Sequence, residues 1–482
     1  MVKHIATTAA FLTLAVAATL GRQPADTTSG MLKSIDARRD QYAAVAKQIW
    51  DYAELGFQEE RSSALLEKTL ADAGFTVERG VAGMPTAFTA SYGSGKPVIA
   101  VIGEFDALPG LSQAAGDAAR HPLVTGGSGH ACGHNLLGTA SAAAAIAVKD
   151  WMIQTKQPGT LRYYGTPAEE GGGGKVYMVR AGLLKDVDAV VTWHPGDQNS
   201  ANPASSLATI AADFRFYGVA AHAAAAPDKG RSALDAVESM DYMVNMMREH
   251  VPQETRIHYI IKNGGVASNI VPDYAMAEYQ ARHPDMRVLQ EIWARIVKAS
   301  EGAAIGTGTR VEHEIITSYW NVLPNDTLTA VAHRNLTRVG GVDYTPEEQA
   351  FADKLRATLI DPATPMGAQK PIEPMKTGLV GSASTDVGDI SWNVPTAQLV
   401  TATFVPGVPA HSWQATACTG MSIGVKGMIV AAKTMALTMA DLFTDPSTLS
   451  KAKDEFLRKR GGPEFKYSSL VGSRLPPFDY RK

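Results

Sequence analysis

Three short apolar runs constrain the fold of this chain more strongly than any other feature. They are 98-VIAVIGEFDALPG-110, 160-TLRYYGTPAEE-170 and 187-VDAVVTWHPG-196. Short, nearly continuous apolar runs of this kind are typical of central strands that are covered on both faces. A helical segment, residues 137–152, lies between the first two. The pattern therefore predicts an α/β fold with a mostly parallel central sheet.

A different pattern begins near residue 204. It predicts, in order, strand 208–218, helix 232–250, strands 256–264 and 275–283, helix 286–304 and strand 309–320. This βαββαβ order is typical of a compact ferredoxin-like domain with an open sheet edge. Because the α/β pattern returns with a strand in 396–407 and a helix in 422–443, we expect the second domain to be inserted into the first.

These patterns divide the 482 residues into five segments. They are a signal peptide at 1–22, the first part of the α/β domain at 30–203, the inserted domain at 204–322, the second part of the α/β domain at 323–446 and a C-terminal extension at 447–482. The chain is long enough for each domain to bury its own core. The polar extension is expected on the surface.

The charge balance excludes one class of partner. The formal net charge is -3, whereas a dedicated nucleic-acid binder normally carries a basic excess on one face. We therefore expect no nucleic-acid partner and a small-molecule substrate.

The first twenty residues predict export. They combine Lys3, a short apolar stretch and the small-residue exit Ala15-Val16-Ala17, which together are typical of a signal peptide. A weak membrane anchor is the alternative, but the stretch is short for a bilayer span of about 20 residues. The prediction is a periplasmic or secreted protein that has no stable membrane association after cleavage.

Potential metal ligands follow the predicted strands. The candidates are His130, Cys132 and His134 in 129-GHACGHNLLGTA-140, Glu169 and Glu170 after one strand, His194 after another, and His411 in 408-VPAHSWQA-415. Each alone is more often a structural histidine, a buried thiol or a solvated turn. Open α/β sheets present their sites beyond the carboxyl ends of strands, so the coincidence of several candidates there predicts a metal site.

The ligand types indicate the kind of metal. Thiolate, imidazole and a single carboxylate suit zinc or another first-row divalent ion better than calcium or magnesium. Five protein ligands exceed what one catalytic zinc takes, so a pair of ions about 3.5–4 Å apart is expected. Because adjacent side chains project in different directions, one glutamate of the pair can bind metal while the other moves a proton.

With these residues in view, the chain resembles the dinuclear-metal aminoacylase and carboxypeptidase family, metallopeptidase family 20. Within it, the chain is most similar to amidohydrolases of the p-aminobenzoyl-glutamate hydrolase B-subunit type. The matching segments are DYAELGFQEERSS, GEFDALPGLSQ, GHACGHN, GTPAEEGGGGKVYM, TWHPG, AAHAAAAPDKGRSALDAV, GGVASNIVPD, STDVGDISWNVPT and AHSWQA, which span residues 51–415.

The resemblance assigns roles in a catalytic α/β domain. It implies two divalent ions, zinc or manganese, Glu169 as general acid/base, and five metal ligands: Cys132, His134, Glu170, His194 and His411. Asp106 is expected to orient a ligating imidazole. Many relatives have a ligating histidine where Glu104 stands, so the role of Glu104 stays open. His130 is a possible partner of a ligand.

The inserted domain resembles the lid and dimerisation domain of that family. By this resemblance the chain forms a homodimer, and His222 reaches the partner subunit's site and polarises the scissile carbonyl. Asn269 and Arg282 would hold the substrate, although Arg282 can also be read as a surface charge at a strand end.

The function implied is a metal-dependent amidohydrolase that acts on N-acyl or N-aroyl amino acids or dipeptides, with p-aminobenzoyl-glutamate-like amides as the leading substrates. Two alternatives remain open. Cys132 can be the nucleophile of a thiol hydrolase, and the chain can be a binding protein that keeps the fold without catalysis.

Overall fold

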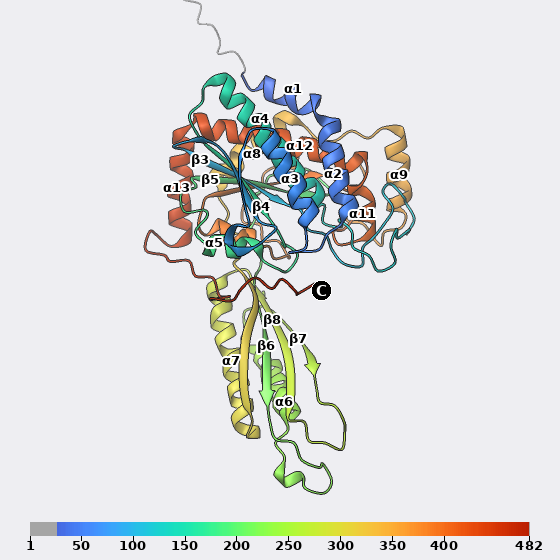
Figure 1. Cartoon of the computed structure of the whole chain (residues 1–482), viewed down its shortest axis with the longest axis vertical. Coiled ribbons are helices and arrows are strands. Elements are labelled where there is room, and N and C mark those ends of the chain that lie inside the picture. Colours follow the sequence, from blue (N-terminus) through green and yellow to red (C-terminus); the bar gives the residue numbers. More distant parts are fainter. Residues whose placement is uncertain (1–26, 482) are drawn as a thin grey trace, which may run out of the picture.

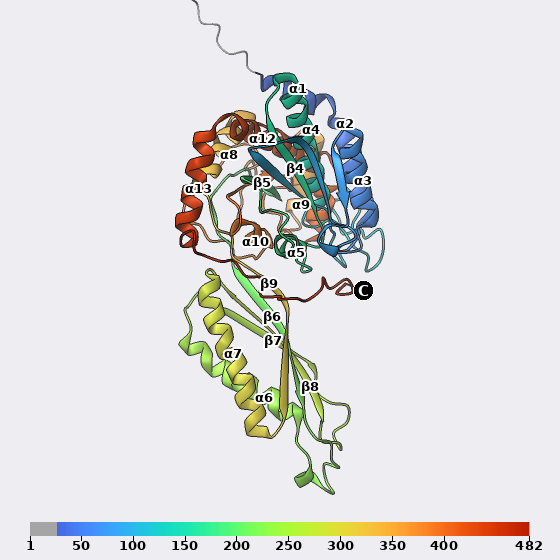
Figure 2. The ribbon, with the colours of Figure 1, turned by 60° about the vertical axis from the view of Figure 1, so that its left-hand side comes forward.

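The computed structural model describes residues 27–481, in which an α/β domain carries an elongated second domain (Figure 1). Figure 2 shows the same separation of the two domains from another side. The predicted signal peptide, residues 1–22, lies outside the described residues.

The α/β domain is built on a six-stranded sheet with the order β1-β2-β4-β3-β5-β10. Its strands are β1 (Thr76–Arg79), β2 (Phe88–Ser94), β3 (Val98–Glu104), β4 (Gly159–Thr166), β5 (Ala189–Gly196) and β10 (Thr396–Ala402). The four strands from β4 to β10 are parallel, whereas β1 and β2 add an antiparallel edge. All seven residues of β3 are buried. The predicted mostly parallel, covered sheet is confirmed.

Helices cover both faces of this sheet. Val101, Tyr163 and Val191 face a core formed with α1 (Ser29–Ala37), α2 (Arg39–Tyr52), α3 (Glu60–Asp72), α4 (His134–Thr155), α8 (Asp326–Val339) and α12 (Ser422–Thr444). Ile102 and Val190 face the opposite core, which includes α5 (Gly174–Arg180) and α10 (Val387–Ser391). At the rim, α9 (Pro346–Arg356) and α11 (Trp413–Thr419) share a smaller core.

Helices α4 and α12 are long and apolar enough to cross a membrane by length and composition. In each of them, however, 83% of the apolar window is buried inside the protein. They are therefore the central helices of the α/β domain.

The second domain, called the lid here, has the predicted βαββαβ order. Its elements are β6 (Ala208–Tyr217), α6 (Ala233–Met247), β7 (Arg256–Asn263), β8 (Tyr274–His283), α7 (Met286–Thr307) and β9 (Arg310–Tyr319). The strands form an antiparallel sheet in the order β7-β8-β6-β9, and both helices share one apolar core with it. Short 3-10 turns occupy Pro227–Lys229 and Arg248–His250 in the lid, and another occupies Val81–Gly83 in the α/β domain.

The C-terminal extension lies mostly on the surface, but a few of its residues anchor it to the rest of the protein. It begins with a helix, α13 (Pro446–Arg460), in which Phe456 is buried in the core of the lid with Trp320 and Trp392. The chain then runs along the junction of the two domains (Figure 1, Figure 2). Its aromatic residues pack into this junction, which composition alone did not reveal.

Candidate metal centre

The five predicted metal ligands come from different connections of the α/β domain. Cys132 lies two residues before α4, which begins at His134; Glu170 follows β4; His194 lies in β5; and His411 follows β10. Because β3, β4, β5 and β10 are parallel, the connections that follow them meet at one edge of the sheet. The structure brings all five side chains together there.

These side chains form two overlapping groups of possible ligand atoms. In each group the atoms lie within 4.8 Å of one another: Cys132 with His134 and His194, and Cys132 with Glu170 and His411. The Sγ of Cys132 lies 3.4 Å from His194 Nε2, and His411 Nε2 lies 3.2 Å from Glu170 Oε1. Since Cys132 belongs to both groups, the arrangement suits two neighbouring cations with a shared ligand.

Two buried atoms of this cluster favour a cation as their partner. His134 Nε2 and Glu170 Oε1 are buried and lack a hydrogen bond of good geometry, although Glu104 Oε2 and His411 Nε2 lie 3.2 Å from them. Buried polar atoms normally have a partner, and a divalent ion is one that imidazole and carboxylate can share. The donor set of thiolate, imidazole and carboxylate therefore fits zinc or a similar ion.

Asp106 connects two of the candidate ligands. Its Oδ1 lies 2.8 Å from His134 Nδ1, which leaves His134 Nε2 directed into the cluster. Its Oδ2 accepts a hydrogen bond of 2.9 Å from the backbone N–H of Glu170. Burial opposes ionisation of Asp106, but the neighbouring His134 outweighs burial and lowers the pKa of Asp106. This is the geometry that an orienting carboxylate requires.

Glu169 occupies a different environment from its neighbour. Possible ligand atoms of Glu169, Glu104 and His134 lie within 4.8 Å of one another. Burial, followed by repulsion from Glu104 and Glu170, raises the pKa of Glu169 well above its usual value. A carboxylate with a raised pKa is suited to accept a proton and return it near neutral pH.

A buried ion triad behind the cluster was not predicted from the sequence. Lys175 Nζ, fully buried at the start of α5, lies 2.8 Å from Glu104 Oε1 and 2.7 Å from Asp386 Oδ1. Burial disfavours the charge of Glu104, but Lys175 and then His134 outweigh burial and lower the pKa of Glu104. The only sequence signal for this triad is the lysine that follows four glycines. Its burial in the structure indicates charged partners, because lysine is almost never fully buried unless it is paired.

His130 and Cys418 lie outside the ligand groups. His130 Nε2 is 3.0 Å from the Ile49 carbonyl oxygen, and burial, then the charge of His134, lowers the pKa of His130 to about 3. Cys418 and Cys132 are both buried and free, so they form no disulfide with each other.

The predicted catalytic residue His222 and the predicted substrate-binding residues Asn269 and Arg282 lie on the lid. His222 and Asn269 are exposed in the connections that follow β6 and β7, at the end of the lid far from the α/β domain (Figure 1). The backbone N–H of Ala223 donates to the Asn269 carbonyl oxygen at 3.0 Å, so the two connections are side by side. The structure does not bring them to the metal cluster of the same chain.

Arg282 lies at the other end of the lid, on β8. It lines a cavity of about 570 Å³ with Arg256 and His258 of β7 and with Val380–Ser382 of the α/β domain. Two guanidinium groups and the carboxylate of Glu254 line this cavity, and a guanidinium group can pair with a carboxylate. The roles of all these residues remain predictions.

Known proteins share the sequence pattern of this chain. The model of Peptidase family M20/M25/M40 matches residues 100–436. The chain is 44% identical to the B subunit of p-aminobenzoyl-glutamate hydrolase from Escherichia coli (strain K12), over 88% of this chain and 93% of that protein. It is 30% identical to Xaa-Arg dipeptidase of Mus musculus, over 88% and 90%.

Solved structures share the fold. A dinuclear metal-binding peptidase from the M20 family of Bacillus subtilis superposes with a TM-score of 0.58 at 17% identity, covering 85% of this chain and 99% of that chain. The aminobenzoyl-glutamate utilization protein from Klebsiella pneumoniae superposes with a TM-score of 0.59 at 18% identity, covering 85% and 97%. The family model and the sequence identity to these relatives show that the chain belongs to peptidase family M20/M25/M40.

Proposed function

We propose that this protein is a metal-dependent amidohydrolase that cleaves the amide bond of N-acyl or N-aroyl amino acids. The observation that carries the proposal is the convergence of five possible ligand side chains beside Glu169. Membership of the family supports the reaction type. The similarity to the B subunit of p-aminobenzoyl-glutamate hydrolase supports p-aminobenzoyl-glutamate-like amides as substrates, and dipeptides are the second class.

Cys132, His134, Glu170, His194 and His411 would hold two divalent ions, zinc or manganese. Bound there, the ions would supply acidity to a water molecule and positive charge beside the scissile carbonyl. Similarity to a dinuclear metal-binding peptidase supports this stoichiometry.

Glu169 carries the proton in this proposal. It accepts a proton from the attacking water and returns it to the leaving amide nitrogen, so the amine departs neutral. Burial, and then the negative charges of Glu104 and Glu170, raise the pKa of Glu169.

His222 is proposed to act in the site of a partner subunit within a homodimer. Its Nδ1 accepts hydrogen bonds of 3.1 Å from the backbone N–H groups of Ala224 and Ala225. In neutral imidazole the proton is then on Nε2, which is free to donate to a developing oxyanion. Asn269 beside it and Arg282 in the lid cavity are proposed to hold the substrate and its carboxylate.

The signal-like residues 1–22 support an exported, periplasmic or secreted enzyme. There it would act on amide conjugates or dipeptides outside the cytoplasm.

Metal removal tests the proposal against a thiol hydrolase. The protein is dialysed against a chelator, assayed on p-aminobenzoyl-glutamate and N-acyl amino acids, and then reloaded with zinc or manganese. We expect activity to disappear on chelation and to return with metal. Full activity after chelation would favour Cys132 as a nucleophile. Against that alternative, burial and then the charge of Glu170 raise the pKa of Cys132, whereas a nucleophilic thiol needs a lowered pKa.

The same assay distinguishes an enzyme from a binding protein. A binding protein on this fold would bind metal and the amides without hydrolysing any of them. Turnover of one of these amides that depends on metal would exclude that alternative.

A further inference from the structure

The last residues of the chain return to the metal cluster. Residues 463–481, called the C-terminal strap here, cross the junction between the two domains (Figure 1, Figure 2). Arg180 Nη1 in α5 donates to the carbonyl oxygens of Gly472 and Arg474, at 2.8 and 2.7 Å. The strap is thus fixed to the α/β domain before its final residues.

Those final residues contact the turn that carries the glutamate pair. Arg481 Nη2 donates to the Glu170 carbonyl oxygen at 2.6 Å, and the Tyr480 hydroxyl donates to the same oxygen at 3.3 Å. The rings of Phe478 and Tyr480 pack against Phe57, with centroids 5.4 and 5.9 Å away. The contact therefore combines a charged hydrogen bond with an apolar anchor.

The turn needs external support because its own backbone is irregular. Ala168 has a φ of 57° and Gly171 a φ of 102°, conformations that favour glycine and cost energy for alanine. The Ala168 N–H is held by the carboxylate of Glu59 at 2.8 Å, and the Glu170 N–H by Asp106 at 2.9 Å. These carboxylates fix the N–H groups of the turn, and the strap fixes the Glu170 carbonyl.

We propose that the C-terminal strap is a positioning element of the active site. By holding the backbone of Glu170, Arg481 and Tyr480 keep its carboxylate on the ligand cluster and keep Glu169 on the substrate side. The matched part of the family model ends at residue 436, so the strap is a feature that this model does not include. The inference rests on the proposed function, because it assigns Glu170 to metal binding and Glu169 to proton transfer.

Three variants of the full-length, metal-loaded protein test this role. Arg481→Ala and removal of residues 478–482 take away the donors, whereas Arg481→Lys keeps one charged donor. Partners that orient metal ligands are typically worth 10–100-fold in metal affinity or activity. We expect kcat to fall at least about tenfold in the first two variants, with KM within about threefold of wild type, and Arg481→Lys to recover most of the loss.

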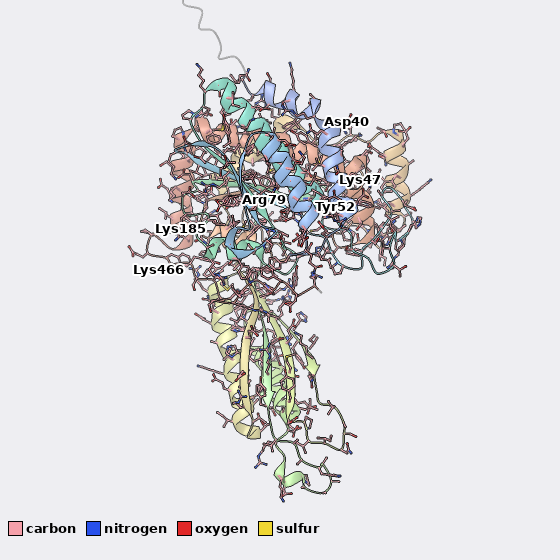
Figure 3. All side chains as sticks on the ribbon, in the orientation of Figure 1. Asp40, Lys47, Tyr52, Arg79, Lys185 and Lys466 are labelled. Atoms are coloured by element: carbon pink, nitrogen blue, oxygen red, sulfur yellow. The ribbon has the colours of Figure 1, made fainter. Side chains whose placement is uncertain are left out.

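Lys466→Ala is the matched control. It also removes a cation from the strap, but Lys466 is exposed at the side of the molecule (Figure 3), so kcat should not change. A synthetic peptide of residues 472–482 added to the shortened protein should restore part of its kcat, and a scrambled peptide should not. A merely structural segment would not give this rescue in a protein that is already folded.

Metal affinity gives a result that does not depend on turnover. Zinc competition with a chelating dye should show weaker binding by Arg481→Ala and by the shortened protein, even if no tested amide is a substrate. Wild-type kcat and zinc affinity in the shortened protein would overturn the strap proposal while leaving the proposed function intact. Loss of kcat through unfolding alone, seen by circular dichroism and without peptide rescue, would also overturn it.

Discussion

Glu169 is the side chain on which the proposed reaction depends most directly. Glu169→Gln keeps the shape of the side chain but cannot accept a proton, so we expect kcat to fall by about 10²–10⁴-fold. Metal content should stay at the wild-type level, because five other side chains are assigned as ligands. Steady-state kinetics and metal analysis of the same sample check both parts.

Glu60→Gln provides the control for this substitution. Glu60 is exposed at the start of α3, so its replacement should leave kcat unchanged. Undiminished turnover of Glu169→Gln would refute the proton-transfer role.

The predictability of single residues depends on how local their signal is. The candidate ligands could be selected from the sequence because each stands beside a strand end or a helix start. Lys175 and Asp386 could not, because they are 211 residues apart in the chain and the glycines before Lys175 do not indicate its partner. The contact of Lys175 with Glu104 explains how this buried carboxylate, whose role stayed open, remains charged.

Among the secondary-structure elements, α10 carries a buried carboxyl group, that of Asp389. Asp389 on α10 accepts hydrogen bonds from the Trp320 N–H at 3.1 Å, at the base of the lid, and from the Tyr467 hydroxyl at 2.5 Å. Burial raises the pKa of Asp389 from 3.8 to about 8. Its carboxyl group therefore joins the lid and the strap to the α/β domain.

This raised pKa predicts a pH-dependent effect on stability. Between pH 4 and 8 the unfolded chain loses the proton of Asp389 while the folded protein keeps it. The contribution of Asp389 to the free energy of unfolding is therefore fully present below this window and falls as the pH rises through it. Asp389→Asn cannot titrate. The free energy of unfolding of Asp389→Asn should therefore increase relative to that of wild type by on the order of 1 kcal/mol for each pH unit in this window.

Denaturant unfolding at pH 5, 6.5 and 8 measures this difference. Asp40→Asn, on an exposed position of α2, is the control. A constant difference between Asp389→Asn and wild type across the window would show that Asp389 ionises at its usual pH.

Elements with strong apolar patterns were predicted well, and those without were not. The central strands and the βαββαβ order of the lid are confirmed. The edge strands β1 and β2 carry exposed and polar positions, so their sequences lack the apolar pattern that would have predicted them as strands of this sheet. The strap is held by contacts to distant backbone carbonyls and single aromatic rings, which a sequence pattern does not encode.

At the scale of the whole molecule, one chain leaves His222 far from its own metal cluster. If His222 serves the partner subunit's site, two inactive proteins should complement each other. Mixing Glu169→Gln with His222→Ala under conditions of subunit exchange should give heterodimers with one complete site. With random exchange in a twofold dimer, we expect about a quarter of wild-type activity.

Each protein incubated alone serves as the control and should stay inactive. Analytical ultracentrifugation of the mixture confirms whether dimers form. Dimers without recovered activity would contradict a role of His222 across subunits.

The central claim is that distant parts of the chain hold a pair of ions. Anomalous X-ray diffraction from crystals of the zinc- or manganese-loaded protein tests it directly. We predict two peaks about 3.5–4 Å apart within coordination distance of Cys132, His134, Glu170, His194 and His411. An active, fully loaded protein with no anomalous peak at these side chains would contradict the claim.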